Sequence, residues 1–209
     1  MDEPLSNLDA KLRNQMRAEI IKLREKIDTT FLYVTHDQVE AMTLGDRIVI
    51  MRDGFIQQIG TPQEVFNHPA NLFVAGFIGT PQMNFFDAIL TKKGDKYVAT
   101  VQGADFELPA EKQAALKNMS NVPTNVVVGV RPVHIHLSET GIPAEVDVSE
   151  LMGSELHLHV NSNGKDIVIV VPTTDIDLNA VHGSHKKVAY SFRPELMHFF
   201  DKETEKNLF

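Results

Sequence analysis

Hydrophobic positions in the first part of the chain follow a helical pattern, then a strand pattern, then a helical one. Apolar residues recur at helical spacing over residues 9–27 with charges between them, and Asp9 is suited to cap this helix. A short apolar run at residues 31–34 predicts a buried strand. A second helix is expected to begin after Asp37 and to stop near Gly45.

A hairpin and two short helices are predicted next. Residues 47–51 and 55–59 are expected to form two strands, joined by an Asp-Gly pair suited to a tight turn. Residues 61–64 read Thr-Pro-Gln-Glu, which is a capping box with proline at the first helical position. Asn71 is placed to cap a last helix that ends at Gly79.

Beyond residue 80 the helical periodicity nearly vanishes, apart from a helix-forming connector at 110–117, and short alternating strands take over. The expected strands are 85–91, 97–101, 126–131, 134–137, 144–151, 155–160, 166–171, 187–192 and 196–200. Many short strands predict a small barrel or sandwich, for which an OB-like barrel is one option. We therefore predict an α+β chain with two domains, residues 1–80 and residues 81–209.

Two segments of the second domain share a short pattern. Residues 130–137 and 192–199 each place Arg-Pro after a strand and a histidine four residues after the proline. The repeat indicates either two related half-barrels or a chance similarity.

Composition narrows the classes of function. The 209 residues are 43% hydrophobic, enough for a real core, and carry a net charge of −8, which argues against a nucleic-acid partner. There is no cysteine, so disulfides and thiolate metal sites are excluded and a reducing compartment fits. The acidic start is not expected to be a signal peptide, and no apolar run approaches the roughly 20 residues needed to span a bilayer. Work at a membrane would require docking onto another protein, without direct insertion.

Two ordered motifs carry a family resemblance. Residues 2–9 read Asp-Glu-Pro-Leu-Ser-Asn-Leu-Asp, and residues 33–38 read Tyr-Val-Thr-His-Asp-Gln. They resemble the Walker B end with the D-loop, and the switch-histidine loop, of ABC-type ATPases. Further similar stretches lie at residues 38–42, 46–48 and 60–62, and residues 130–132, 153–155 and 200–204 resemble the regulatory domain of maltose- and multiple-sugar-type importers. By resemblance, the chain is the C-terminal part of the ATP-binding subunit of a carbohydrate ABC importer: a remnant of an α/β P-loop ATPase domain followed by an OB-like regulatory barrel.

The resemblance implies a role for each matching residue. Glu3 would act as general base on the attacking water, His36 would contact the γ-phosphate, and Asp2 would hold Mg²⁺. The D-loop, which faces the partner subunit, would contain Ser6, Asn7 and Asp9. Each residue also has an ordinary interpretation, as a solvated end, a structural histidine or a helix cap; only the joint pattern favours the functional one.

The resemblance also implies partners and a location. The parent protein would be a cytoplasmic Mg-ATP hydrolase at the inner face of the cell membrane. It would work as a homodimer, or paired with a similar subunit, on two membrane-spanning permeases, and it would energise sugar import. In some members of the family, proteins that regulate sugar uptake bind as well.

Parts of an ATP site are missing from this sequence. It contains no G-x-x-x-x-G-K-[ST] P-loop, no Ser-Gly-Gly-Gln type signature loop and no Gln-loop upstream. Because the P-loop supplies most of the grip on phosphates, we expect this chain alone neither to bind nor to hydrolyse ATP appreciably, and to hold no cofactor. Several apolar side chains of residues 1–80 would also be exposed to solvent, unless they repack or the chain dimerises. These side chains are Leu12, Met16, Leu23, Phe31 and Tyr33.

An alternative function is open for residues 81–209. A related small barrel in other proteins binds molybdate-like oxyanions. Such sites use backbone N–H groups and hydroxyls, for which Gly153-Ser154 and Thr173-Thr174 are the suggestive positions.

A third hypothesis is a zinc site made of histidines. The pairs His134/His136 and His157/His159 are each spaced two apart, so each pair would lie on one face of a strand and could ligate Zn²⁺. We favour a structural interpretation, because the apolar residues that alternate with the second pair would occupy the buried face.

Overall fold

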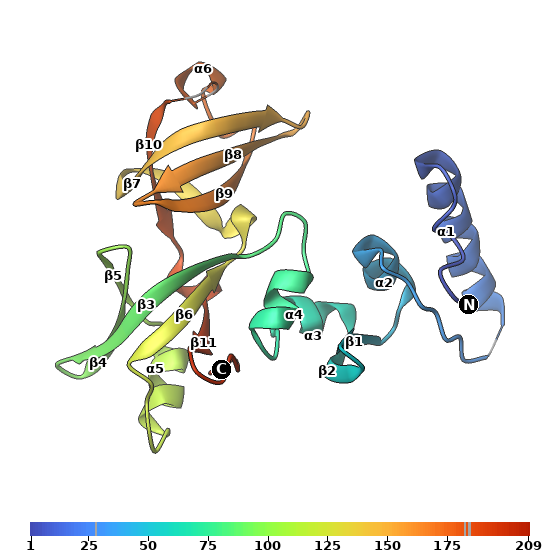
Figure 1. The fold of residues 1–209 in the computed structure, drawn as a ribbon, viewed down its shortest axis with the longest axis horizontal. Helices are drawn as coiled ribbons and strands as arrows, with labels where there is room; N and C mark the ends of the chain where they lie inside the picture. Colours follow the sequence, from blue (N-terminus) through green and yellow to red (C-terminus); the bar gives the residue numbers. More distant parts are fainter. Residues whose placement is uncertain (28, 182, 184) are drawn as a thin grey trace. The chain divides into compact units, whose positions relative to one another are not determined.

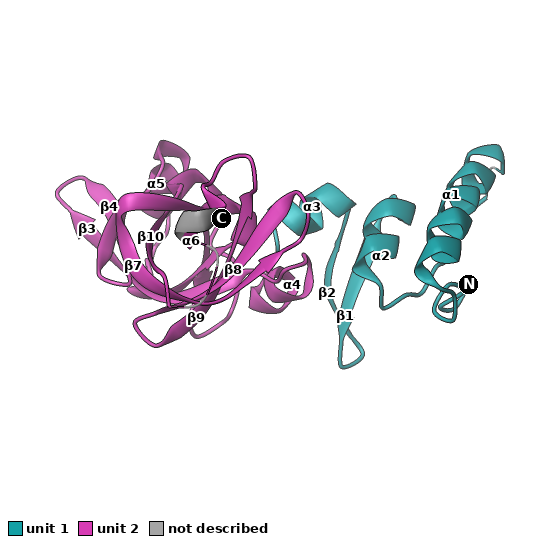
Figure 2. Ribbon diagram, turned by 90° about the horizontal axis from the view of Figure 1, so that it is seen from above, with its two compact units in different colours: residues 1–70 teal, residues 71–209 magenta. Residues whose placement is uncertain are grey.

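The computed structural model describes residues 1–27, 29–181, 183 and 185–209 (Figure 1). The chain forms two compact units, Met1–Ala70 and Asn71–Phe209 (Figure 2). The units divide before the boundary predicted near residue 80, because helix α4 (Leu72–Phe77) belongs to the second unit. Ala75 of this helix is buried in one cluster with Met83 and Phe200.

The first unit begins with two capped helices. Helix α1 (Ala10–Lys26) starts at Asp9, whose side chain accepts a hydrogen bond from the Leu12 N–H, and none of its residues is buried. Helix α2 (Gln38–Leu44) starts at Asp37, whose side chain accepts from two backbone N–H groups of the first turn. The two predicted helices and their caps are confirmed.

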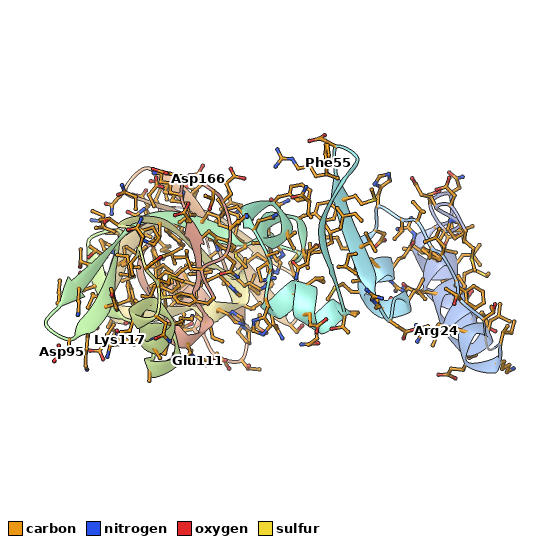
Figure 3. The ribbon with its side chains drawn as sticks, turned by 90° about the horizontal axis from the view of Figure 1, so that it is seen from below. Arg24, Phe55, Asp95, Glu111, Lys117 and Asp166 are labelled. Atoms are coloured by element: carbon orange, nitrogen blue, oxygen red, sulfur yellow. The ribbon has the colours of Figure 1, made fainter. Side chains whose placement is uncertain are left out.

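A hairpin and a third helix complete this unit. Strands β1 (Ile48–Arg52) and β2 (Phe55–Gly60) pair antiparallel, and the Asp-Gly pair between them takes positive φ angles of 51° and 81°, as a tight turn requires. Phe55 projects from this hairpin with 73% of its surface exposed (Figure 3). Helix α3 (Pro62–Asn67) has the predicted capping box.

The prediction of a strand at residues 31–34 is wrong. Val34 makes only an isolated parallel bridge with Asp2. A strand needs a neighbour along its length, and within the described part of the chain only the first residues lie beside this segment. The predicted solvent exposure is confirmed for Leu12, Met16 and Leu23, which are 40%, 38% and 44% exposed. Phe31 and Tyr33 are only half-buried.

The second unit contains two antiparallel sheets (Figure 1). One has the order β11-β6-β3-β4-β5 and the other the order β10-β7-β8-β9. The strands of the first are β3 (Asn84–Lys93), β4 (Lys96–Val101), β5 (Ala104–Glu107), β6 (Asn125–Val130) and β11 (His198–Asp201). Those of the second are β7 (Ile135–Leu151), β8 (Glu155–Ser162), β9 (Lys165–Pro172) and β10 (Lys187–Phe192). Besides α4, this unit contains the helices α5 (Ala110–Lys117) and α6 (Leu178–Val181) and two 3-10 turns, η1 (Pro132–His134) and η2 (Pro194–Leu196).

Two predicted strands are in fact one. Residues 135–137 and 144–151, predicted as parts of two strands, belong to the long strand β7, whereas residue 134 lies in η1; the pairing of β7 with β10 shifts register between Ala189 and Tyr190. Gly141 lies in this irregular stretch, where a Cβ would meet the backbone oxygen of Tyr190 at 2.2 Å. Gly141 therefore marks a bulge inside a continuous strand. Strand β5, which is only four residues long, was not predicted.

The repeated Arg-Pro pattern corresponds to a repeated structure. In both copies a strand leads through Arg-Pro into a 3-10 turn and then into a strand of the other sheet, as β6–η1–β7 and as β10–η2–β11. The two copies lie side by side, since β6 pairs with β11 and β7 pairs with β10. This arrangement supports the half-barrel interpretation over a chance repeat.

A single hydrophobic core lies between the two sheets. Side chains of both sheets contribute, with aromatic contacts of Phe86, Phe106 and Tyr190 to Phe192 at centroid distances of 5.0, 5.1 and 5.5 Å. Lys112 of α5 donates hydrogen bonds to the carbonyl oxygens of residues 194, 195 and 197, which fixes the helix to the second Arg-Pro turn.

Candidate functional site

The sequence-predicted catalytic residues meet at the start of the first unit. The Glu3 N–H donates to the Val34 carbonyl at 2.8 Å, and the Val34 N–H donates to the Met1 carbonyl at 2.9 Å. This pairing places Glu3 next to the segment that ends at His36. His36 Nε2 lies 3.0 Å from Glu3 Oε1, with 86% of the His36 side chain and 39% of the Glu3 side chain exposed.

Ser6 closes the turn that presents Glu3. Its hydroxyl donates to the Glu3 carbonyl oxygen at 2.9 Å, and its N–H donates to the same oxygen at 3.3 Å. Glu3 has a φ of 40°, in the left-handed region that non-glycine residues seldom adopt. The turn therefore aims the Glu3 side chain into a small hollow that Ser6, Thr35, His36 and other residues line.

The remaining predicted residues lie outside this hollow. Asp9 is the N-cap of α1 and accepts from the Leu12 N–H at 2.9 Å. Asp2 and Asn7 are exposed and do not line the hollow. The structure thus brings Glu3, Ser6 and His36 together, whereas Asp9 has the capping role of its ordinary interpretation.

A buried carboxyl group beneath the hollow was missed by the sequence reasoning. Glu40 is 2% exposed, and its Oε2 accepts hydrogen bonds from Tyr33 Oη at 3.0 Å and from Thr35 Oγ1 at 2.7 Å. Burial and the neighbouring Glu40 raise the pKa of Tyr33. The signal in the sequence was a glutamate at the third position of α2, which would normally be assigned to a capping box.

The charged side chains around the hollow are more suitable for a general base than for a phosphate-binding site. Glu3, Asp37 and Glu40 contribute carboxyl groups, while Arg13, 3.6 Å from Asp37, is the one Lys or Arg side chain among the described residues that line it. Lysine, which binds phosphate groups elsewhere, is absent from the described residues that line it.

A magnesium ion would find few protein ligands here. Nowhere in the described ranges do three or more His, Cys, Asp or Glu side chains form a group that could hold a metal ion. Asp2 can offer a single carboxylate, which fits the usual pattern of Mg²⁺ bound by one or two carboxylates together with substrate phosphates and water.

The two positions suggested for an oxyanion lie together, but they bond to each other. The N–H and the hydroxyl of Thr173 both donate to the Ser154 carbonyl, at 3.0 and 3.2 Å. The Thr174 hydroxyl bonds to the Asp175 carboxylate at 2.9 Å. Donors that already have protein acceptors, beside a carboxylate, give no support to oxyanion binding.

The second histidine pair lies as the structural interpretation expects, whereas the placement predicted for the first pair is wrong. Leu156, Leu158 and Val160 are buried, and the intervening histidines are on the other face of β8. His157 contacts Glu155 at 3.3 Å, and His159 contacts Glu150 at 2.9 Å. His134 lies in η1 and His136 in β7, so that first pair does not share one strand.

A search of the described helices for a membrane span finds none of sufficient length and apolar character.

Comparison with known proteins gives two family matches in the second unit. The model of the MalK OB fold domain matches residues 79–135, and the model of the TOBE domain matches residues 128–200. The "Uncharacterized ABC transporter ATP-binding protein YcjV" of Escherichia coli O6:K15:H31 is 48% identical over 98% of this chain and 55% of its own length. The "Oligosaccharides import ATP-binding protein MsmX" of Bacillus subtilis is 44% identical over 98% of this chain and 56% of its own length.

The chain spans about half the length of the curated relatives that it matches. Among solved structures, the cytoplasmic molybdate-binding protein ModG aligns with 56% of this chain and 94% of its own, with a TM-score of 0.42 and 12% identity. Likeness at that level supports no conclusion about ligands.

Proposed function

Because this chain belongs to the family of ABC transporter ATP-binding proteins, with a MalK OB fold and a TOBE domain in its second unit, we propose that it is the C-terminal part of a subunit that energises carbohydrate import. In this proposal, residues of the first unit supply the catalytic base, the switch histidine and the D-loop of an ATPase. The second unit is the regulatory barrel.

One observation carries the catalytic part of the proposal: Glu3 and His36 lie 3.0 Å apart on segments far apart in the sequence. A carboxylate in this position can accept a proton from an attacking water. The exposed imidazole of His36 can donate to a phosphate oxygen and so sense a nucleotide. Asp2 would contribute a carboxylate to Mg²⁺, which when bound would neutralise negative charge on the phosphates.

The name of the Bacillus relative guides the choice of substrate. That protein is described as importing oligosaccharides. We propose the same class of cargo here, carried through membrane-spanning permeases that this subunit contacts at the inner face of the membrane. Ser6, Asn7 and Asp9 would face a second ATP-binding subunit, with which the protein would form a dimer.

We further propose that the 209-residue chain by itself does not use ATP. The sequence has no P-loop, and three of the described residues that line the hollow, Glu3, Asp37 and Glu40, carry carboxyl groups. Carboxyl groups repel a polyphosphate in the absence of compensating cations. The activity that we propose for this chain alone is association with other proteins, through the barrel and through the exposed apolar surface of the first unit.

Two measurements test the proposal. Calorimetric titration of the chain with millimolar Mg-ATP is expected to give no saturable binding; clear saturation would refute the claim about the chain alone. For the catalytic claim, the chain is joined behind the N-terminal half of the Bacillus relative, and ATP hydrolysis is measured. We expect activity that Glu3→Gln lowers by a factor of about 100 or more, since general-base catalysis contributes about 10²–10⁴-fold.

The matched control is Glu19→Gln. Glu19 is an exposed residue of α1 that forms an ion pair with Lys22, away from the hollow. This variant is expected to keep full activity. Equal activity of the Glu3→Gln variant and the parent fusion would exclude Glu3 as the base.

A further inference from the structure

Glu40 differs from the other glutamate at the same place in a helix. Both Glu40 and Glu64 are the third residue of a short helix, in α2 and α3. Glu64 closes a capping box, with its Oε2 accepting from the Thr61 N–H at 2.7 Å. A glutamate at this position normally does so, because that bond satisfies the N-cap N–H.

In α2 the capping bond is made by another residue. The N–H of the N-cap Asp37 donates to Thr35 Oγ1 at 3.0 Å. Because Thr35 satisfies this N–H group, the Glu40 side chain is not needed for the capping bond. It points into the unit instead, where its Oε2 accepts hydrogen bonds from the hydroxyls of Tyr33 and Thr35. A buried carboxyl group is costly unless hydrogen bonds satisfy it, so these two bonds hold the segment strongly.

The segment that Glu40 holds is the one that carries His36. Tyr33 and Thr35 flank Val34, whose backbone bonds to residues 1 and 3, and His36 comes directly after Thr35. The ring of His36 is 86% exposed, so packing around the ring does not determine where it lies. The position of the ring opposite Glu3 therefore depends on the backbone position of the segment that carries His36.

From this geometry we propose that Glu40 is a positioning residue for the switch histidine: through the hydroxyls of Tyr33 and Thr35 it fixes the backbone that holds His36 against Glu3. The positioning holds for this chain with or without nucleotide. Its consequence for ATP hydrolysis rests on the function proposed above.

The contact between His36 and Glu3 can be followed by NMR in the 209-residue chain. Glu3→Gln is expected to shift the His36 ring signals, and that shift measures the contact. In a Glu40→Ala background we expect the effect of Glu3→Gln to fall to less than half. In a Glu64→Ala background, which removes the corresponding glutamate of α3, we expect it to be unchanged.

A second pair of variants separates positioning from simple loss of folding. Thr35→Val keeps the shape of the side chain but removes the hydroxyl, and is expected to reduce the effect of Glu3→Gln as Glu40→Ala does. Thr35→Ser keeps the hydroxyl and is expected to preserve it. An undiminished effect in both the Glu40→Ala and the Thr35→Val backgrounds would overturn the proposal, as would an equal loss with Thr35→Ser.

The fusion protein described above extends the test to catalysis. Glu40→Ala is expected to lower its ATP hydrolysis at least tenfold, with Thr35→Ser near the parent value. If the NMR results hold but neither Glu3→Gln nor Glu40→Ala changes hydrolysis, the positioning stands and the proposed ATPase role of this site fails. If Glu3→Gln abolishes hydrolysis while Glu40→Ala leaves both hydrolysis and the NMR coupling intact, only the role of Glu40 fails.

Discussion

The two units of this chain differ in how they bury their hydrophobic side chains. In residues 71–209, two sheets enclose one core to which nearly every strand contributes. In residues 1–70, the 17-residue helix α1 buries none of its residues, although its sequence has apolar positions at helical spacing. Local signals such as caps and turns are therefore sufficient to specify the elements of the first unit, whereas its described residues bury only a few apolar side chains, among them Leu44, Ile50 and Val65.

The largest effect is expected when the two units are prepared as separate fragments. We expect a fragment of residues 71–209 to unfold in urea as one cooperative transition with a dispersed NMR spectrum. We expect a fragment of residues 1–70 to show no such transition, since many of its large apolar side chains are exposed. Circular dichroism and NMR measure both. A cooperative transition of the 1–70 fragment as a monomer would show that the first unit has a sufficient core.

Limited proteolysis of the whole chain provides the control. Cleavage is expected first within residues 1–70, leaving a resistant fragment that corresponds to the second unit. The reverse order of cleavage would contradict the comparison.

A matched pair of substitutions gives the next largest effect. Leu158 of β8 is fully buried, and Leu23 of α1 is 44% exposed. Leu158→Ala is expected to lower the free energy of unfolding of the second unit by about 2–5 kcal/mol, because it removes apolar contacts and leaves a cavity. Leu23→Ala is expected to change it by less than about 0.5 kcal/mol. Urea unfolding of the whole chain, followed by signals of the second unit, measures both variants.

The sequence predicted local structure well wherever a chemical signal was local. Asp9, Asp37, Thr61 and Asn71 cap the helices that they were expected to cap. The OB-like character of the second unit was also predicted, from the density of short alternating strands. These features depend on residues near one another in the chain, and periodicity reports on them directly.

Features that depend on distant residues were harder to predict. The apolar run at 31–34 looks like a buried strand, but strand formation requires neighbours that these described residues do not provide. The break expected within β7 is a bulge, which only the close approach of Gly141 to the Tyr190 backbone explains.

The candidate site shows the same division. Motifs located Glu3 and His36, and the structure brings them together. Glu40 escaped notice because its sequence position indicates a capping box. The bond that changes this assignment is itself local, because the Asp37 N–H donates to the hydroxyl of Thr35 two residues earlier, but only the structure shows which of the two side chains accepts it.

Helix caps offer a smaller test of the two units. The side chain of Thr61 caps α3 in the first unit, and that of Asn71 caps α4 in the second. Asn71→Ala is expected to lower the unfolding free energy of the second unit by about 1 kcal/mol, because α4 contributes Ala75 to a buried cluster. Thr61→Ala is expected to speed amide hydrogen exchange in α3 and to leave the unfolding of the second unit unchanged. Loss of stability in the second unit from Thr61→Ala would mean that the units fold together.

The smallest expected effect concerns pH and the first Arg-Pro turn. Burial lowers the pKa of His134 below its ordinary value, and the positive charges of Arg131 and Arg193 lower it further. Its buried Nδ1 has no hydrogen-bond partner among the described residues. Because the unfolded chain then binds a proton more readily than the folded one, the stability that the neutral imidazole contributes is present above about pH 6.5 and is lost as the pH falls through the lowered native pKa.

The test compares urea midpoints of the second unit at pH 7.5 and at pH 5.5. The parent chain is expected to lose stability over this interval, His134→Gln to lose less, and Arg193→Gln to fall between them, since it removes one of the two cations. An identical loss in the parent and in His134→Gln would exclude the imidazole as the cause. A loss confined to signals of the first unit would show that the pH-sensitive group lies outside the second unit, which would contradict the prediction for His134.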